Sequence, residues 1–227
     1  MSLNVSTNIS SLSAQKNLRA NSIGLERAVA RLSSGLRINK AADDAAGLAI
    51  SEGLRAQIRG LSMVQRNASD GISLIQTAEG VLNSVHAMLS RMRELALQSA
   101  NGTYGTSERA YLDDEFQRLV AEIDRIATTT EFNGQELLNG ELSGGISFQV
   151  GLNSVADDRI TVSVPNAHTS TIGVHNGRTL MSQAITSIDG ALRALSSIDV
   201  AIADTSRIRG GLGAAQNRLE HTIDNIQ

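Results

Sequence analysis

The residues of this chain that could bind a metal or transfer a proton are its histidines and its paired aspartates. Metal ligands on one helix need a short, regular spacing, which the four histidines lack: His86, His168, His175 and His221. His168 and His175 lie in a segment that predicts a loop and has no carboxylate at ligand spacing. We therefore expect solvated histidines and no metal site.

Two pairs of adjacent aspartates, Asp43-Asp44 and Asp113-Asp114, are the candidates for a general acid and base. Neighbouring residues on a helix point about 100° apart, so the members of a pair cannot act on the same substrate. We expect these aspartates to cap helices and to keep the surface soluble.

Glycine clusters bind phosphate when a strand leads into them and a helix follows. Gly144-Gly145 and the cluster Gly210, Gly211 and Gly213 lack this context, and no Gly-Lys-Ser/Thr follows them. We interpret them as flexible points or close helix contacts. There is also no cysteine, no recognisable set of nucleophile and base, and no cofactor motif. The sequence thus predicts a protein that is not an enzyme and has no cofactor.

Composition favours long helices over a thick globular core. Three phenylalanines, two tyrosines, no tryptophan and one proline leave Ala, Leu, Ile and Val to form the buried seams. No stretch approaches the roughly 20 apolar residues of a membrane span. The first 15 residues lack a charged start and an apolar run, so they do not form a cleavable secretory signal.

The net charge of −3 is unevenly distributed, because residues 1–43 carry six basic and two acidic side chains. This segment therefore has a charge of +4, which leaves −7 for residues 44–227. A basic amphipathic start is compatible with a nucleic-acid arm, a membrane-surface helix or a transit peptide. The interpretation that we favour is a helix face that pairs with an acidic partner, without nucleic acid.

Apolar spacing predicts helices over the first 130 residues. A first stripe ends near Ser33-Ser34-Gly35, where Gly35 is suited to a left-handed C-cap. A heptad pattern then predicts a second helix from about Asp44 to Ala100. After Asn101-Gly102, Thr106 or Ser107 can cap a third helix that returns antiparallel to the second.

The apolar period changes between residues 131 and 179. Residues 146–150 and 160–164 alternate around a turn at 153–158, which predicts a β-hairpin. A last helix is predicted from Leu180, and its pattern continues to the end of the given sequence. The predicted fold is mainly α: a long antiparallel helical bundle or coiled coil, shaped as a rod, with a small β-hairpin region.

Several phrases carry a more specific signal. They are MSLNVSTNISSLSAQKNL, RLSSGLRINKAADDAAGLAISEGLRAQIRGL, SDGISLIQTAEGVL, RMRELALQSANGTY, EFNGQELLNG and GGLGAAQNRLEHTIDNI. In this order, over nearly the whole chain, they resemble bacterial flagellins. A hook–filament junction protein built on the same core is the alternative. A chemoreceptor-like signalling coiled coil is disfavoured by the hairpin and by the missing membrane segment.

The resemblance implies a subunit that self-assembles into the extracellular filament of the bacterial flagellum, the helical propeller of motility. Three parts are expected: an N-terminal inner-core helix segment (1–43), a helical rod core (44–130 and 181–227), and a β-hairpin and loop region (131–180), without variable outer domains. Secretion through the flagellar type III apparatus is implied, with an export chaperone and with filament cap and junction proteins as partners. The family's further C-terminal helix, which carries the usual chaperone site, has no counterpart after Gln227. The chain as given is therefore expected not to form filaments.

One polar patch of the second helix lies beside its core seam of Leu89, Met92, Ala96 and Ser99. Arg91, Leu95 and Gln98 are each one residue behind that seam, so Leu95 either widens the buried stripe or joins an exposed contact surface with Glu115. Arg91, Leu95, Gln98 and Glu115 resemble the flagellin patch that the flagellin-sensing Toll-like receptor, an innate immune receptor of vertebrates, recognises. The same family face packs between protofilaments. The resemblance implies that Arg91→Ala or Leu95→Ala weakens receptor binding with little loss of helicity.

Overall fold

The structure is a computed structural model that describes residues 8–226. Its long helices are α1 (Ile9–Ser34), α2 (Ala45–Ala100), α3 (Thr106–Thr129) and α4 (Ile188–Ile226). The predicted fold class, mainly helical with a small hairpin region, is confirmed. The chain divides into two compact units, and the boundary lies within α2, between Arg59 and Gly60. The functional division that we predict at residues 43, 130 and 180 stays a prediction.

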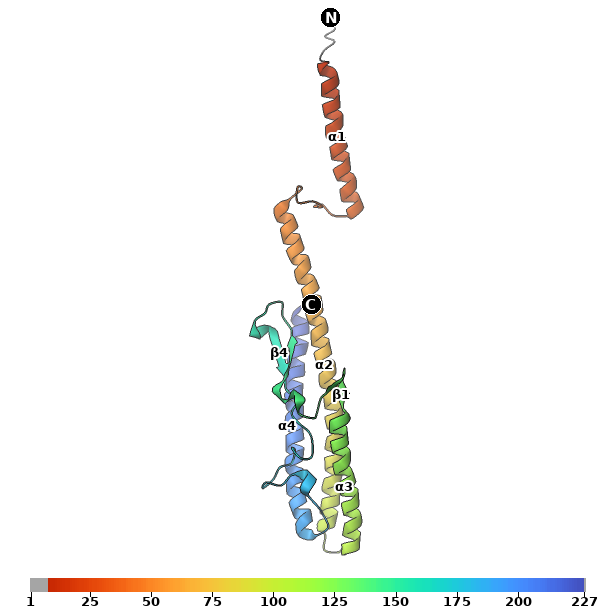
Figure 1. The fold of residues 1–227 in the computed structure, drawn as a ribbon, viewed down its shortest axis with the longest axis vertical. Helices are drawn as coiled ribbons and strands as arrows, with labels where there is room; N and C mark the ends of the chain where they lie inside the picture. Colours follow the sequence, from red (N-terminus) through yellow and green to blue (C-terminus); the bar gives the residue numbers. More distant parts are fainter. Residues whose placement is uncertain (1–7, 227) are drawn as a thin grey trace. The chain divides into compact units, whose positions relative to one another are not determined.

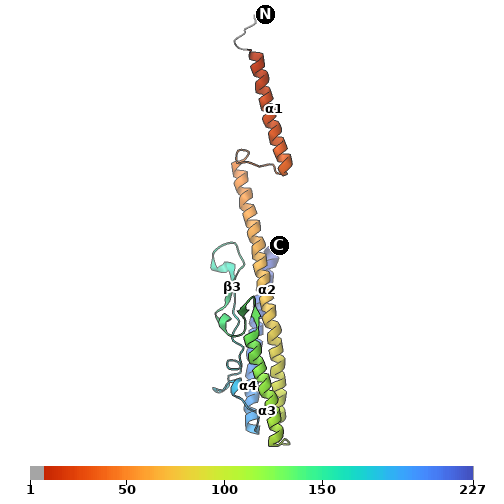
Figure 2. The same cartoon turned by 45° about the vertical axis from the view of Figure 1, so that its right-hand side comes forward.

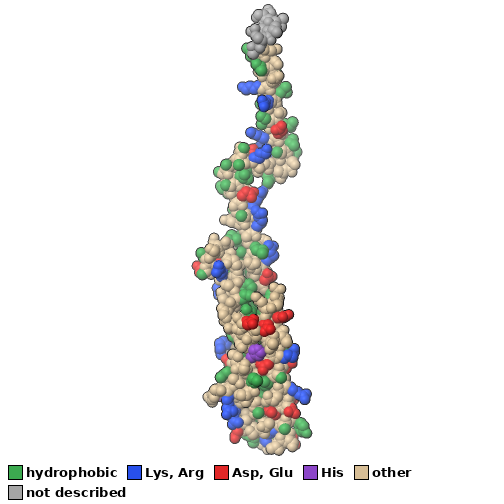
Figure 3. Space-filling view, in the orientation of Figure 1, with side chains coloured by type: hydrophobic (Ala, Val, Ile, Leu, Met, Phe, Trp, Pro, Cys, Tyr) green, Lys and Arg blue, Asp and Glu red, His purple; other side chains and the backbone are tan. Residues whose placement is uncertain are grey.

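Both ends of α1 are capped. The cap at the C-terminus is the one that the sequence predicts. The Asn8 side chain accepts a hydrogen bond from the Ser11 N–H, and Gly35 adopts the left-handed conformation with φ 68°. No residue of α1, which lies wholly within the described range, is buried. Its apolar side chains are therefore on the surface, as Figure 3 shows, and Leu32 is 86% exposed.

The exposed stripe of α1 leads to a prediction about its stability. In a monomeric sample, the amides between Leu18 and Leu36 are expected to exchange rapidly with solvent, because most helical stability in proteins comes from packing. Hydrogen exchange measures this, and the packed stretch of α2 around the buried residues Val85, Leu89 and Met92 provides a protected reference. Strong protection of α1 in the monomer would contradict the prediction.

The aspartate pairs act differently from each other. Asp44 caps α2 by accepting the Gly47 N–H at 2.9 Å, and Asp43 accepts the N–H groups of Asn39 and Lys40 in the preceding turn. Helix capping is confirmed for Asp44, whereas Asp43 stabilises the turn before α2. Asp113 instead accepts the Ile185 N–H at 2.7 Å and so tethers a distant loop. The expectation of a capping or solubilising role for Asp113 is wrong.

In the second unit, α3 and α4 lie alongside α2 and run antiparallel to it (Figures 1 and 2). One buried cluster surrounds Leu82, Leu138 and Leu212, and the other surrounds Leu89, Phe116 and Ile198. Thr106 is the first residue of α3 and Gly105 is its N-cap, without a side-chain hydrogen bond. The predicted cap by Thr106 or Ser107 is therefore wrong.

Two short antiparallel hairpins follow α3. Strand β3 (Ile146–Gln149) pairs with β4 (Arg159–Val162), which confirms the predicted hairpin. The smaller hairpin, β1 (Glu131–Phe132) with β2 (Gln135–Glu136), is not among our predictions. Its turn is Asn133-Gly134, and both residues have positive φ. An Asn-Gly pair is the usual signal for such a two-residue turn.

The last helix begins at Ile188, eight residues after the predicted start at Leu180. Ser187 forms the boundary, since its carbonyl accepts the Ala191 N–H and its hydroxyl accepts the Gly190 N–H. Leu180 and Ile185 are fully buried, so they continue the apolar period, although Leu180 begins a short 3-10 helix (Leu180–Ser182) and Ile185 lies in the loop before α4. The sequence prediction was wrong because burial and helical periodicity coincide there.

The chemistry-bearing residues of the loop 163–179 and of α4 also depart from expectation. The His168 Nδ1 lies 3.2 Å from Asp124 Oδ1, and Asp124 also accepts hydrogen bonds from the N–H and hydroxyl of Thr169. His168 is thus a packed loop residue and not a solvated one. Gly210, Gly211 and Gly213 lie inside α4, and a methyl group placed at each has no atom within 4 Å. Of our two interpretations of these glycines, close helix contacts are therefore wrong for the part of the chain that the structure describes.

Candidate contact surface

The sequence-predicted patch centres on an ion-pair cluster that joins α2 to α3. The Arg91 guanidinium lies 2.9 Å from a Glu115 carboxylate oxygen across the two helices and 3.0 Å from Glu94 on its own helix. All three side chains are between 46% and 66% exposed. The hydrogen bonds that Arg91 donates, first to Glu115 and then to Glu94, raise the pKa of Arg91. Arg91 therefore keeps its positive charge on an accessible surface.

A second polar contact lies one to two turns further along α2. The Gln98 amide donates to the Tyr104 hydroxyl at 2.9 Å, and Tyr104 belongs to the connection between α2 and α3. Gln98 is exposed. We call the accessible side chains of Arg91, Glu94, Gln98 and Glu115, together with the partly buried Tyr104, the Arg91 surface. Both of its contacts hold polar groups in place at the seam between two helices.

Leu95 does not belong to this surface. Its side chain is 0% exposed and packs in the same buried cluster as Met92 and Phe116. Of the two alternatives for Leu95, the wider buried stripe is confirmed and the exposed position is wrong, because α2 is covered by both α3 and α4 and so buries a wider arc than one seam. Leu95 lies on the same helix, four residues after Arg91 and three before Gln98, and anchors that part of α2 to the core.

Tyr111 is an exposed residue that our sequence prediction missed. It lies on α3, four residues before Glu115, and is 75% exposed. The signal for it was present: Leu112 and Phe116 define the apolar stripe of α3, and Tyr111 is an aromatic residue outside that stripe. An aromatic side chain at a solvent-facing helix position is typical of a contact residue.

Other classes of site find little support in the part of the chain that the structure describes. Between residues 8 and 226, no three His, Asp or Glu side chains gather in a way that could hold a metal ion. None of the helices in that range has the length and apolar content that a membrane crossing requires.

Comparison with known families and proteins gives matches over most of the chain. The family model described as the bacterial flagellin N-terminal helical region matches residues 5–143, and that of the C-terminal helical region matches residues 195–227. A flagellin of Halalkalibacterium halodurans is 48% identical over 225 residues, which cover 98% of this chain and 79% of the relative.

Solved structures have an architecture similar to that of this chain. The Bacillus cereus flagellin crystal structure aligns with a TM-score of 0.61 and 31% identity, over 72% of this chain and 89% of that chain. A putative flagellar hook-associated protein from Vibrio parahaemolyticus aligns with a TM-score of 0.68 over 82% of this chain and 94% of that chain. Its identity is only 16%, so this second likeness concerns the fold alone.

Proposed function

This chain belongs to the bacterial flagellin family, and on that premise we propose that its Arg91 surface is a contact between neighbouring subunits of the filament. The protein is a structural subunit of the flagellar filament and not an enzyme. The family self-assembles, and the filament is exposed outside the cell. What needs a proposal is the surface through which one subunit meets the next.

The observation that supports this surface is the Arg91 cluster near a buried leucine. Arg91 bridges Glu94 and Glu115 from two helices while its side chain stays 49% exposed. A guanidinium has five N–H donors, and the groups of Arg91 that donate to these glutamates leave others free for a partner. Leu95 is fully buried nearby on α2 and packs that part of the helix into the core. Arginine held rigidly in this way is a frequent hot spot of interfaces.

We also propose, from the family resemblance, that the same surface is recognised by the flagellin-sensing Toll-like receptor. Of the four residues carried over, Arg91, Gln98 and Glu115 have accessible side chains, whereas Leu95 does not. Receptor contact is therefore proposed for the three polar residues, with Leu95 as their support.

The route out of the cell and the accessory partners are proposals of the same kind. We propose export through the flagellar type III apparatus, with an export chaperone and with filament cap and junction proteins as partners. Two properties support threading of the chain through a narrow channel: it has no cysteine to form disulfides, and no residue of α1 is buried. Little packing would have to be disrupted at that end.

Replacing Arg91 tests the contact proposal. Arg91→Ala is expected to weaken both subunit association and receptor binding about tenfold or more, because hot-spot arginines carry a large share of binding energy. Association of subunits short of filaments is measured by sedimentation velocity at high concentration, and receptor binding by surface plasmon resonance with the receptor ectodomain. Circular dichroism should stay unchanged, because Arg91 lies outside the core.

The matched control is Arg125→Ala, which removes another exposed arginine paired with a glutamate, Glu122, three residues away on α3. Its effect on either partner should be small. If the two variants behave alike for association, the subunit contact is wrong, and if they behave alike for the receptor, the receptor site is wrong. The two assays thus decide the two partners separately.

A further inference from the structure

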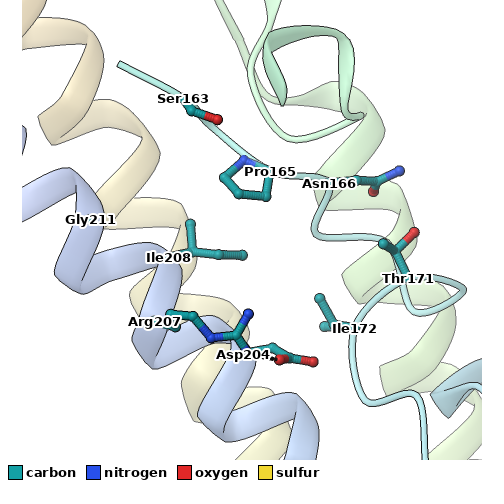
Figure 4. A pocket seen from close by; sticks show the side chains of 9 residues that line it. All are labelled: Ser163, Pro165, Asn166, Thr171, Ile172, Asp204, Arg207, Ile208 and Gly211. Atoms are coloured by element: carbon teal, nitrogen blue, oxygen red, sulfur yellow. Dashed lines mark hydrogen bonds and ion pairs between the residues drawn. The ribbon is translucent and has the colours of Figure 1, made fainter. Parts of the chain in front are cut away.

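A pocket of about 270 Å³ opens between α4 and the loop that follows β4. Pro165, Ile172 and Ile208 face it from three sides, as Figure 4 shows. Asp204 and Arg207 line one edge and form an ion pair with each other. Asp204 also accepts the Gly173 N–H at 3.1 Å. Ser163, Asn166 and Thr171 also line it, so the pocket has apolar and polar walls and a fixed carboxylate at its rim.

The size and lining of the pocket indicate its occupant. Small-molecule sites usually measure about 300–1,000 Å³, so this pocket better fits a single large side chain. Carboxylate oxygens have two lone pairs each, so Asp204 can accept a further hydrogen bond. Apolar walls beside an acceptor match the phenol of a tyrosine, whose ring is buried while its hydroxyl finds a partner.

The chain itself presents such a side chain. Tyr111 is 75% exposed, more than any other large hydrophobic residue in the described part of the second unit. The remaining aromatic residues of the chain are at least partly buried: Tyr104, Phe116, Phe132 and Phe148. We propose that Tyr111 of one copy inserts into this pocket of a second copy. This inference rests on the proposed subunit contact, since Tyr111 borders the Arg91 surface.

The charges around the two features are complementary. Tyr111 is flanked on α3 by Glu108 and Asp114, both exposed. The stripe of α4 beside the pocket reads Arg207, Gly211, Ala214 and Arg218, each four or three residues after the last. Arg207 is 76% exposed at its side chain, and the small residues between the arginines leave room for another helix. An acidic helix face carrying the tyrosine thus meets a stripe with two arginines beside the pocket, of which Arg207 is paired with Asp204 and Arg218 is exposed.

The contact joins different surfaces, so it can propagate. Two ion pairs show at which height along α2 the pocket and Tyr111 lie. Arg209 of α4 pairs with Glu79 near the pocket, and Glu115 of α3 pairs with Arg91 near Tyr111. The 12 residues between Glu79 and Arg91 correspond to about 18 Å of helix. Parallel copies joined through Tyr111 are therefore staggered along their length. A heterologous contact with such a stagger does not close on itself and forms an open filament.

Cross-linking tests the insertion directly, since the chain has no cysteine of its own. One variant carries Ser107→Cys, one helical turn before Tyr111, and the other carries Thr171→Cys at the pocket. Mixed at high concentration with a short bis-maleimide, the two are expected to give covalent heterodimers in excess of either homodimer. A mixture without this excess would overturn the proposal, whether or not long filaments form.

Substitutions on each side test Tyr111 as the inserting side chain (the knob) and the pocket as the site that receives it (the socket). Tyr111→Ala in the first variant and Gly211→Leu in the second should each lower the heterodimer yield at least tenfold. Gly210→Leu is the matched control, because Gly210 is also an exposed α4 glycine with open space around it but does not line the pocket. Circular dichroism verifies that all variants are folded. The leucine variants are expected to keep α4 intact, because leucine favours a helix more than glycine does.

Equal yields for Gly211→Leu and Gly210→Leu would show that the pocket is not the socket. Unchanged yield for Tyr111→Ala would show that Tyr111 is not the knob. Either result contradicts the insertion of Tyr111 into the pocket. The effect of Arg91→Ala on association is a separate measurement and tests only the Arg91 surface. If Arg91→Ala has no effect but the cross-link responds to Tyr111 and Gly211, the proposed Arg91 contact is wrong and the pocket contact holds.

Discussion

Leu95→Ala is expected to lower the free energy of unfolding of the second unit by about 2–5 kcal/mol. The side chain is fully buried, so its truncation removes apolar contacts and leaves a cavity between α2 and α3. For a unit of this size, each kcal/mol corresponds to roughly 2–4 °C in melting temperature. Thermal and urea unfolding followed by circular dichroism measure the change.

Leu97→Ala is the control for this experiment. Leu97 lies two residues further along α2 and is 48% exposed, so its truncation should change stability by no more than about 0.5 kcal/mol. Similar melting temperatures for the two variants would mean that Leu95 is accessible in solution. In that case the alternative in which Leu95 joins an exposed contact surface would hold. A large difference leaves Leu95 as a core residue whose loss weakens binding only indirectly.

Arg109→Ala has the second large expected effect, a loss of about 2–3 kcal/mol of stability. Arg109 is only 8% exposed, and its guanidinium donates to the carbonyl of Ser99 at 2.8 Å and to that of Asn101 at 2.9 Å. These carbonyls belong to the C-terminal end of α2, which lacks intrahelical partners and carries a partial negative charge. The substitution leaves them without their donor beside a buried core.

Two further variants separate this role from a general effect of charge. Arg118→Ala removes an exposed arginine from the same helix and should be nearly neutral. Arg109→Lys should recover only part of the stability, because one ammonium lacks the planar fork that reaches both carbonyls. Equal unfolding midpoints for the alanine variants of Arg109 and Arg118 would refute the capping role. Urea denaturation at neutral pH is sufficient for the comparison.

The sequence by itself determined the helices and their order. Heptad spacing predicted α2 nearly to its ends, and the left-handed Gly35 was predicted at the end of α1 because glycine alone adopts that conformation without strain. The alternation on both sides of residues 153–158 predicted the pairing of β3 with β4. Arg91, Gln98 and Glu115 were likewise predicted beside the seam, where their side chains are accessible. These features depend on local periodicity and backbone preference.

Only the tertiary structure decided which side chains are covered. Leu95 is buried because two helices pack on α2, and the number of neighbours cannot be read from the period of one helix. The start of α4 was missed since Leu180 and Ile185 are buried by a loop that Asp113 and Gln117 tether. The pocket beside Asp204 combines residues some 40 positions apart in sequence. Local pattern sets the direction of a side chain, whereas its burial depends on distant segments that pack against it.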